Sequence, residues 1–528
     1  MSKVDTRFPA GYRTSTFPDW LQWRSSLSPD RLAVKDRDGA LSFHQLQEQA
    51  SNISGVLASW RVRKGSRVLL LLNSSTLYVA LVHALARLGA IAVPVNQRQT
   101  TSEILWQIGD CNPSLIIYDE SLASIVKEVQ QKSSPKLQSR VSFKSLDEVK
   151  DTRSSDRMES AQFKASSIHS IIYTSGSTGK PKGAVLTASN LLWHSISFGI
   201  NHGAFPSDRW LLVMPLYHIG GYSVIFRSVM LGSGIVIHSK FDAGTAFESI
   251  NRDGITLLSL VPAMLESMLR IRSQSFSEKL RLIFLGGSET PPALIRQIVR
   301  RKLPVLLTYG MTESCSQIAI SKAATESSVS DRNSYQAMFP TFVKIGFDRA
   351  RDKSTNQDRK VGRIMLSGPT ISPGYWGGRN SKAPTNDRNV EWFDTGDVGF
   401  WNGDTGFVVL GRENEMIISG GENIYPIEVE SPLLEHKAIE EAVVVGREDS
   451  KWGQRVEAVL KVKLDSVRPS ASELTDFLRG RIGSYKIPKA FHFLDSFPKT
   501  QTGKTKRTAI IEILDRMEGK KSRRDLIR

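Results

Sequence analysis

The chain has 528 residues, of which 40% are hydrophobic and 23% are charged, and a formal net charge of +17. This composition is typical of a globular protein and excludes a wholly disordered or fibrous chain. The length exceeds the size at which one hydrophobic core usually stops growing, so we expect at least two units. Positive charge favours polyanionic partners, but scattered Lys and Arg side chains are also typical of a solvated surface, and we expect no nucleic acid partner.

The location of the protein is indicated by what the sequence lacks. Cys111 and Cys315 are the only cysteines, too few for a disulfide framework or a cysteine metal site, which favours a reducing compartment. The first residues lack the apolar core of a signal peptide, and no apolar run is long enough to span a bilayer. We therefore expect a cytoplasmic protein without membrane insertion. Its oligomeric state stays open, with a homodimer as one option.

Amphipathic helices alternate with short apolar strands in the first part of the chain. Helical spacing of apolar residues predicts a helix over 44–60, and a buried strand follows at 67–72. A second helix is predicted over 77–89, with further strands at 91–96 and 115–119. This alternation predicts an α/β fold with a parallel sheet.

Two polar stretches interrupt this pattern. Residues 130–165 are rich in Ser and Lys and are interpreted as a surface excursion, and 349–360 as a long turn. From 392 onward the composition changes to short strands and Gly turns, and then to a compact α/β segment. We expect domains at 1–411 and 412–528.

The segment from Tyr173 to Lys182, Tyr-Thr-Ser-Gly-Ser-Thr-Gly-Lys-Pro-Lys, directly follows an apolar strand. Its two glycines allow a tight turn that brings backbone N–H groups onto an anion, and its side chains add donors and positive charge. The glycine spacing and Pro181 exclude a Walker A loop. We interpret the segment as a phosphate-binding loop, and an unliganded Ser/Gly-rich turn is the alternative. Its candidate binding residues are Thr174, Ser175, Gly176, Ser177, Thr178, Gly179, Lys180 and Lys182.

This decapeptide resembles the signature of the adenylate-forming superfamily, which includes acyl-CoA synthetases, firefly luciferase and the adenylation domains of peptide synthetases. In that family the loop embraces the triphosphate of ATP. The resemblance implies a large N-terminal AMP-binding domain of α/β subdomains with a smaller β-rich subdomain. It also implies a small, mobile α+β C-terminal domain.

Further motifs follow in the order of the family. The segment Leu285-Gly-Gly-Ser-Glu289 resembles the one that lines the adenine, through Gly286, Gly287 and Ser288. The segment Thr308-Tyr-Gly-Met-Thr-Glu313 resembles the motif that supplies a tyrosine stacked on adenine, a threonine on phosphate and a glutamate on Mg²⁺. In this sequence these residues are Tyr309, Gly310, Thr312 and Glu313.

Motifs nearer the C-terminus resemble those that bind the ribose and supply the catalytic lysine. Asp397, in Trp392-Phe-Asp-Thr-Gly-Asp397, matches the carboxylate that binds both ribose hydroxyls, and Arg412 matches the ribose-contacting arginine. The segment Pro498-Lys-Thr-Gln-Thr-Gly-Lys504 matches the motif of the catalytic lysine. Taken singly, Asp397 could be a turn residue and Lys504 part of a basic tail. The order of the motifs favours the functional interpretation.

The chemistry needs these groups because a carboxylate is a poor electrophile until ATP converts it to a mixed anhydride with AMP. The resemblance implies that Lys504 bridges the attacking carboxylate and the α-phosphate. Mg²⁺ on Glu313 and the lysines of the phosphate loop would hold the leaving pyrophosphate. No covalent nucleophile on the enzyme is required. The expected catalytic set is Lys504, Glu313, Thr174 and His218.

The second half-reaction needs another site around the same acyl-adenylate. In the family, the C-terminal domain rotates about a hinge after the ribose-binding Arg412 and presents another face for coenzyme A. By position this hinge, near 412–414, falls at Asn414, where many relatives carry Asp or Lys. The loop that follows resembles the one along which the pantetheine arm passes, at Gly420 and Gly421.

The acid substrate is indicated by the region around His218, which stands where the family places a gating residue near the acyl carboxylate. Arg227 is the one charge on the following apolar helix. It either reaches solvent or caps a carbonyl, or it pairs with a second carboxylate of the substrate. The segments 214–231, 241–242, 257–265 and 308–319 resemble the o-succinylbenzoate–CoA ligases of menaquinone synthesis.

Some positions depart from that pattern. Arg363 stands where the family usually has Glu, and residues 342–353 replace the usual Val-Gly-x-Pro region. We expect both to touch a peripheral sheet. The alternatives are a CoA ligase for another aryl or medium-chain acid, and a stand-alone adenylation enzyme that loads a carrier protein.

Overall fold

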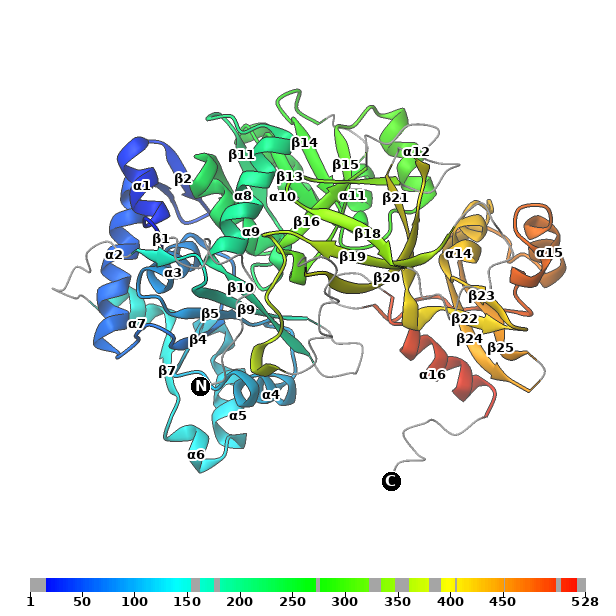
Figure 1. The fold of residues 1–528 in the computed structure, drawn as a ribbon, viewed down its shortest axis with the longest axis horizontal. Helices are drawn as coiled ribbons and strands as arrows, with labels where there is room; N and C mark the ends of the chain where they lie inside the picture. Colours follow the sequence, from blue (N-terminus) through cyan, green and yellow to red (C-terminus); the bar gives the residue numbers. More distant parts are fainter. Residues whose placement is uncertain are drawn as a thin grey trace.

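The structure is a computed structural model, and the residues it describes run from Thr16 to Gly519 with gaps. Figure 1 shows an elongated molecule, with the N-terminal elements at one end and the C-terminal elements at the other. The described ranges are 16–152, 162–174, 181–271, 276–321, 334–346, 360–378, 391–403, 406–450, 452–499 and 505–519.

The first large sheet has six strands in the order β10-β9-β5-β4-β6-β7. Its central strands pair in parallel, while β9 and β10 form an antiparallel pair. Its strands are β4 (Arg67–Leu71), β5 (Ile91–Pro94), β6 (Leu115–Tyr118), β7 (Ser142–Ser145), β9 (Ile168–Thr174) and β10 (Lys182–Thr187). The predicted parallel α/β architecture is confirmed for this sheet.

The helices of this region follow from their sequences. Ser42 caps α2 (Phe43–Ser59) in a capping box with Gln45. The next helix, α3 (Thr76–Arg87), is buried over nearly its whole length, which explains its continuous apolar sequence. The remaining elements up to β8 are β1 (Thr16–Phe17), α1 (Trp20–Leu27), β2 (Leu32–Lys35), β3 (Ala40–Ser42), α4 (Thr101–Cys111), α5 (Ala123–Lys132), α6 (Pro135–Gln138), α7 (Leu146–Asp151) and β8 (Phe163–Lys164).

The interpretation of 130–165 as a surface excursion is wrong in part. Within it, β7 adds a parallel edge strand beside β6, and α7 buries Leu146 and Val149 against the body. Ser145 caps that helix with Glu148. The polar composition arises because an edge strand and a short helix each bury only a few side chains.

The second sheet has thirteen strands among the described residues, in the order β18-β19-β20-β21-β17-β16-β15-β14-β13-β11-β12-β2-β3. The run from β15 to β2 is parallel, whereas β16 to β21 form an antiparallel, β-rich extension. Its later strands are β11 (Arg209–Leu212), β12 (Gly234–Ile237), β13 (Leu257–Leu260), β14 (Leu282–Leu285), β15 (Val305–Met311), β16 (Ser316–Ile320), β17 (Ser334–Ala337), β18 (Phe342–Gly346), β19 (Gly362–Ser367), β20 (Phe393–Trp401) and β21 (Phe407–Arg412).

Helices pack against both sheets and fill the space between them. The largest apolar core joins α2, α3, α8 and α9 to strands of both sheets, and Phe226 and Tyr222 of α9 are buried at its centre. Burial of each large apolar side chain stabilises the fold by about 1.5–3 kcal/mol. The helices are α8 (Ala188–His202), α9 (Ile219–Leu231), α10 (Ala243–Arg252), α11 (Pro262–Leu269) and α12 (Pro292–Arg300).

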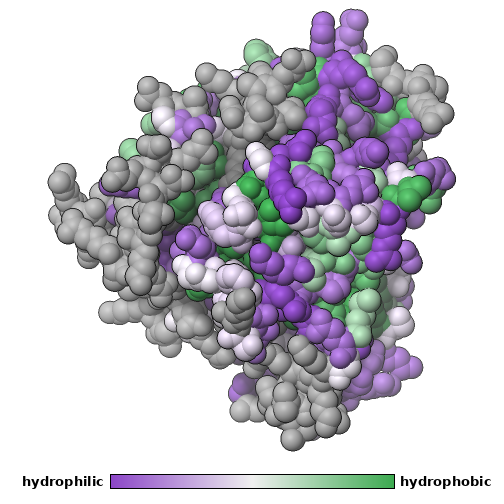
Figure 2. All heavy atoms as spheres, turned by 90° about the vertical axis from the view of Figure 1, so that its right-hand side faces the viewer, coloured by the Kyte–Doolittle hydropathy of each residue, from purple (hydrophilic) through white to green (hydrophobic). Residues whose placement is uncertain are grey.

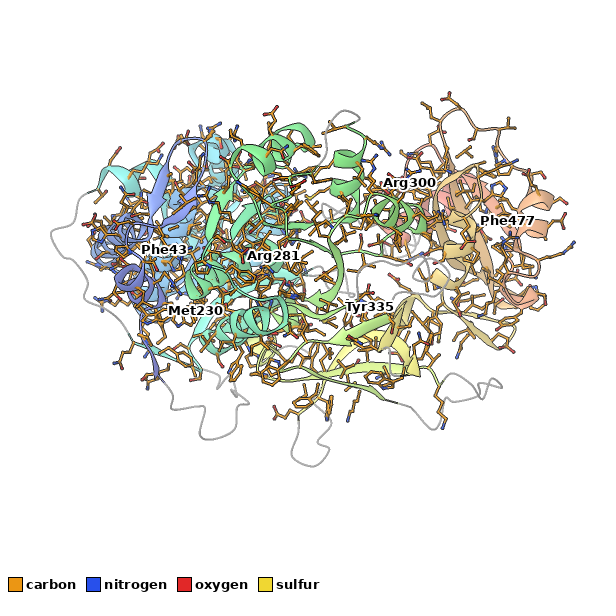
Figure 3. The ribbon with its side chains drawn as sticks, turned by 90° about the horizontal axis from the view of Figure 1, so that it is seen from above. Phe43, Met230, Arg281, Arg300, Tyr335 and Phe477 are labelled. Atoms are coloured by element: carbon orange, nitrogen blue, oxygen red, sulfur yellow. The ribbon has the colours of Figure 1, made fainter. Side chains whose placement is uncertain are left out.

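A separate five-stranded sheet is built from residues after 416, and we call residues 417–519 the C-terminal unit. Figure 2 looks onto this end, where hydrophilic side chains surround smaller apolar areas. In Figure 3, Arg300 marks α12 beside this unit, and Phe477 lies farther out. Its elements are β22 (Ile417–Ser419), β23 (Glu422–Ile424), α14 (Ile427–Leu434), β24 (Ile439–Asp449), β25 (Gly453–Val462), α15 (Ala471–Leu478), β26 (Ala490–Phe493) and α16 (Arg507–Met517).

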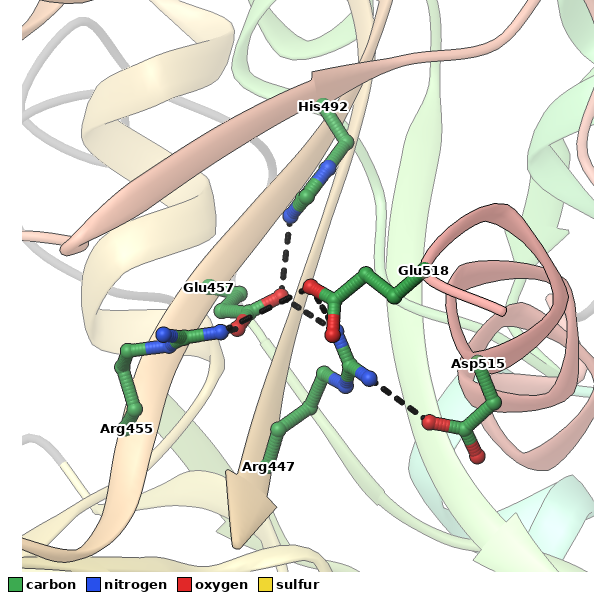
Figure 4. Close-up of polar contacts among 6 residues, drawn as sticks. All are labelled: Arg447, Arg455, Glu457, His492, Asp515 and Glu518. Atoms are coloured by element: carbon green, nitrogen blue, oxygen red, sulfur yellow. Dashed lines mark hydrogen bonds and ion pairs between the residues drawn. The ribbon is translucent and has the colours of Figure 1, made fainter. Parts of the chain in front are cut away.

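A buried charged network ties α16 to this sheet (Figure 4). The carboxylate of Glu457 is fully buried and accepts hydrogen bonds from Arg455 Nε at 2.7 Å and Arg447 Nη1 at 3.4 Å. His492 Nε2 lies 2.9 Å from the same carboxylate. Arg447 also pairs with Asp515 of α16 at 2.7 Å. None of the described helices is long and apolar enough to cross a membrane.

Candidate active site

A cavity of about 3480 Å³ opens between the two large sheets and the C-terminal unit. The parallel strands β13, β14 and β15 end at its wall, and the carboxyl ends of parallel strands are where α/β proteins usually bind ligands. Nearly every motif found in the sequence meets this cavity. The residues that it brings together are Thr174, Lys182, His218, Gly286, Gly287, Ser288, Tyr309, Gly310, Thr312, Glu313, Asp397, Arg412 and Gly421.

The two ends of the predicted phosphate loop lie opposite each other at the cavity. Thr174 ends β9 and Lys182 begins β10, and the two are register partners. The Thr174 hydroxyl donates to the Lys182 carbonyl at 3.4 Å, and the Lys182 ammonium lies 5.5 Å from the Tyr375 ring centroid. The predicted binding residues Ser175, Gly176, Ser177, Thr178, Gly179 and Lys180 lie outside the described residues.

Two glycines of the predicted adenine wall are required by close packing. A Cβ on Gly286 would lie 2.1 Å from the Thr308 hydroxyl, and one on Gly310 would lie 2.1 Å from the Ser316 carbonyl oxygen. Gly287 adopts φ +83°, a conformation that other residues rarely adopt. A side chain at Gly286 or Gly310 would therefore push the neighbouring strand away and distort this wall.

The predicted ribose residues form one hydrogen-bonded cluster. Asp397 and Arg412 are register partners on β20 and β21, and Arg412 Nε lies 2.8 Å from Asp397 Oδ1. The Tyr309 hydroxyl donates to Asp397 Oδ2 at 2.7 Å. Burial and the neighbouring Asp397 raise the pKa of Tyr309, so its hydroxyl remains a donor. These contacts orient a carboxylate that can accept hydrogen bonds from a diol.

Glu313 lies in a short 3-10 helix, Thr312–Ser314, at the end of β15. The Tyr375 hydroxyl donates to Glu313 Oε1 at 2.6 Å, and Ser372 N donates to the Glu313 carbonyl at 2.7 Å. Tyr375 was not singled out from the sequence. The turn-forming Pro-Gly pair before it, Pro373-Gly374, is the signal that marks it.

Magnesium would fit Glu313 only as a single-carboxylate site. No group of three or more His, Cys, Asp or Glu side chains within the described ranges could hold a metal ion. Mg²⁺ is commonly bound by one or two carboxylates together with substrate phosphates and waters. The oxygen donor of Glu313, oriented by Tyr375, matches that chemistry.

His218 and Arg227, the two residues predicted to bind the acid, lie at different depths from the cavity. His218 precedes α9 and lines the cavity. Arg227 is fully buried, which excludes the alternative in which it reaches solvent. Its guanidinium lies over Phe198 at 5.0 Å and over Trp210 at 4.5 Å. Because Trp210 stacks on the cavity-lining Phe284, Arg227 lies behind the wall and not on it.

The charge of Arg227 has little compensation within the described part of the chain. Its Nη2 donates to the Ser223 hydroxyl at 3.2 Å, but its Nε and Nη1 meet no hydrogen-bond partner there. Burial lowers the pKa of Arg227 to about 9, so the group remains charged near neutral pH. The Cys315 thiol, which interacts with Arg227, is neutral because burial raises its pKa to about 12. The buried imidazole of His169 is also neutral, because burial lowers its pKa to about 3.

The C-terminal unit contributes the opposite side of the cavity. Lys504 lies outside the described residues, but Lys499 and Thr505, which form a bridge on either side of it, both line the cavity. Gly420 and Gly421 turn between β22 and β23 with φ +61° and +86°. Gly421 meets the cavity, whereas Gly420 packs against Trp452.

Comparison with known families identifies the family to which a chain with this cavity belongs. The family model described as AMP-binding enzyme matches residues 21–376, and that of the AMP-binding enzyme C-terminal domain matches residues 428–504. The chain belongs to the AMP-binding enzyme family. The family and the fold class predicted from the motifs are thereby confirmed.

Relatives of this AMP-binding enzyme cover almost all of its length. It is 36% identical to a 2-succinylbenzoate–CoA ligase of Bacillus licheniformis, over 93% of this chain and 98% of the relative. It is 35% identical to the Bacillus subtilis protein of the same name, over 93% and 97%. The solved o-succinylbenzoate CoA synthetase of B. subtilis with its acyl-adenylate intermediate matches with a TM-score of 0.82 at 34% identity, covering 94% of this chain and 98% of that one.

Proposed function

We propose that this enzyme converts o-succinylbenzoate and ATP to an acyl-adenylate and then transfers the acyl group to coenzyme A, as expected in menaquinone synthesis. The observation that carries the proposal is the meeting of the ribose cluster, the adenine wall, Glu313 and the ends of the phosphate loop at one cavity. Relatives and solved structures of that name bear out the substrate predicted from sequence.

In the first half-reaction, the side chains of this cavity hold ATP and neutralise charge. Asp397 accepts hydrogen bonds from the ribose hydroxyls while Arg412 and Tyr309 orient its carboxylate. Lys182 and the phosphate loop hold the triphosphate. When bound to Glu313, Mg²⁺ neutralises phosphate charge. Lys504 then stabilises the negative charge shared by the attacking carboxylate and the α-phosphate, the role inferred from its motif.

Arg227 is proposed to favour a dicarboxylic substrate. A buried guanidinium without a described carboxylate partner creates positive potential that a second carboxylate near the wall would relieve. Because Arg227 lies behind Phe284 and Trp210, its charge acts on the substrate across these rings or after one of them moves. His218, on the cavity side, is proposed to contact the carboxylate that reacts.

We further propose that 1–411 and 412–528 are the two domains and that the second half-reaction uses a rotation near Asn414. Gly421 at the cavity supports the passage of a narrow pantetheine arm nearby. A cytoplasmic location, and a homodimer as one option, stay predictions from the sequence.

The substrate assignment is tested with a panel of acids under saturating ATP and coenzyme A. We expect o-succinylbenzoate to give the highest kcat/KM, above benzoate, a coumarate and a medium-chain fatty acid. A clearly higher kcat/KM for one of the monocarboxylic acids would overturn the substrate assignment but leave acid activation intact. Omitting coenzyme A and supplying a carrier protein would test the carrier-loading alternative in the same assay.

A further inference from the structure

A single short segment joins the two large parts of the molecule. The last strand of the thirteen-stranded sheet, β21, ends at Arg412, and the first strand of the C-terminal unit begins at Ile417. Between them lies one 3-10 turn, Glu413–Glu415, with Asn414 at its centre. The two carboxylates on either side of Asn414 are held by different parts of the molecule.

Glu413 is held by the N-terminal part. Arg363 of β19 donates to Glu413 Oε1 from Nη2 at 2.7 Å and from Nε at 3.1 Å. Its Nη1 donates to Asp394 Oδ2 on the neighbouring strand β20 at 3.1 Å. Since β19 and β20 pair within the sheet, Arg363 fixes Glu413 to a rigid element. A glutamate at position 363 would instead face two carboxylates.

Glu415 is held by the C-terminal unit. Arg507, the first residue of α16, donates from Nε to Glu415 Oε2 at 3.3 Å. The same guanidinium pairs with buried Glu430 of α14, with Nη2 at 3.0 Å from its Oε2, and donates to the Val444 carbonyl of β24 at 2.9 Å. Burial acts to lower the pKa of Arg507, but the charges of Glu430 and Glu415 outweigh it and raise the pKa.

Arg507 also follows Lys504 by three positions in the chain. Its contacts therefore connect the turn, two elements of the C-terminal unit and the start of the helix after the predicted catalytic lysine. The structure as a whole is more similar to some ligand-bound forms of the B. subtilis enzyme than to another. The B. subtilis enzyme holding its acyl-adenylate matches at 0.82 and the form with ATP and magnesium at 0.81, whereas a double mutant of it holding a product analogue matches at 0.68, all at 34% identity.

We propose that Arg363–Glu413 and Arg507–Glu415 are two clamps that fasten the ends of the connecting turn to their own domains and leave Asn414 as the pivot. Arg363 and Arg507 are positioning residues: they favour the domain arrangement of the first half-reaction and do not act on the substrate. This inference rests on the proposed two-step function. Rotation at Asn414 changes the direction of the turn on both sides of this residue and separates the two pairs, so the pairs stabilise only the arrangement of the first half-reaction.

The test measures the two half-reactions separately in Arg363→Gln, Glu413→Gln and the double variant. The first is followed as acid-dependent ATP–pyrophosphate exchange, and the second as thioester formation from preformed acyl-adenylate and coenzyme A. We expect each single variant to lower exchange about fivefold, the change expected of one partly exposed ion pair. The double variant should lose no more than either single one, and thioester formation and the KM for ATP should stay within about twofold.

Matched variants separate this effect from a loss of folding. Lys35→Gln removes the ion pair to Asp253 from a lysine on β2 whose exposure is similar to that of Arg363 and which lies away from the cavity, and it should change neither half-reaction. Arg363→Lys keeps the charge and should restore most of the exchange. On the other side of the pivot, Glu415→Gln removes the contact of the turn with Arg507 while the Arg507–Glu430 pair remains. This variant should also lower exchange and leave thioester formation nearly unchanged.

Equal losses in both half-reactions, additive losses in the double variant or a changed KM for ATP would each overturn the clamp proposal. An unchanged exchange rate in Arg363→Gln and Glu415→Gln would do the same. Failure of the proposed function is separate, because it is seen as absence of acid-dependent exchange in the wild-type protein.

Discussion

At the scale of single residues, the site combines motif residues with partners far away in the chain. Tyr375 donates to Glu313 across 62 positions, and Arg363 to Glu413 across 50. The motifs themselves could be located from the sequence because glycine, hydroxyl and charged residues recur there in a fixed order. Their partners could not, because a lone tyrosine or arginine carries no local pattern and acquires its role only through tertiary contact.

Arg227 illustrates the same limit. The sequence left open whether it reaches solvent or meets a carboxylate, and the structure buries it against Phe198 and Trp210. Replacing it tests its link to the substrate. We expect Arg227→Gln to raise the KM for o-succinylbenzoate about ten- to a hundredfold, as for loss of a charge-assisted contact, and to raise that for a monocarboxylic analogue much less.

The control for this prediction is Ser223→Ala, which removes the one described hydrogen-bond acceptor of Arg227 and keeps the guanidinium. It should leave the ratio of the two KM values nearly unchanged. An unchanged ratio in Arg227→Gln itself would assign the residue to packing.

At the scale of elements, the helices and strands between residues 44 and 96 and the strand at 115–119 could be predicted because apolar spacing follows the helical and strand periods. The helix α4 (Thr101–Cys111) and the elements before residue 44 were not predicted. The prediction failed for β7 and α7, which bury few side chains and therefore carry little apolar signal. The charged interior of the C-terminal unit was also not expected. Glu457 lies on β25 in a run of apolar residues, and only the converging Arg447, Arg455 and His492 explain it.

The Glu457 network predicts how stability depends on pH. Burial acts to raise the pKa of Glu457, but hydrogen bonds from His492 and Arg455 outweigh it and lower the pKa from 4.5 to about 2. The ionised carboxylate therefore stabilises the folded state above about pH 4.5, and this stability is lost as the pH falls towards 2. In Glu457→Gln we expect unfolding to cost about 3–5 kcal/mol less near neutral pH.

This prediction is checked by urea unfolding at pH 7 and pH 3, followed by a probe in the C-terminal unit. The difference between wild type and Glu457→Gln should shrink at the lower pH. Glu473→Gln, which alters a half-exposed carboxylate near His436, is the matched control and should change stability little. A difference that is the same at both pH values would show that the charge of Glu457 is not what stabilises the network.

At the scale of the whole molecule, the proposed mechanism places the C-terminal unit in two positions. The domain boundary near 411 could be placed from the change of composition, and the separate sheet after 416 is compatible with it. Lys504, carried by that unit, is predicted to act in one position only. We expect Lys504→Ala to reduce adenylate formation at least about a hundredfold, as for removal of one transition-state contact, and to leave thioester formation from synthetic acyl-adenylate largely intact.

Single-turnover rates of both steps check this prediction, with Lys499→Ala as the control for removal of a nearby positive charge that pairs with Glu441. Similar losses in both steps for Lys504→Ala would contradict the two-position scheme. Such losses would not contradict the proposed nucleotide site, whose described residues lie in the N-terminal part.

In the proposed mechanism, the acid is activated as its adenylate before coenzyme A takes part. The most direct measurement is ATP–pyrophosphate exchange by the intact enzyme without coenzyme A, with and without o-succinylbenzoate. We expect exchange that requires the acid and Mg²⁺, with AMP and the thioester appearing together once coenzyme A is added. Exchange without the acid, or formation of ADP and phosphate in place of AMP and pyrophosphate, would contradict it.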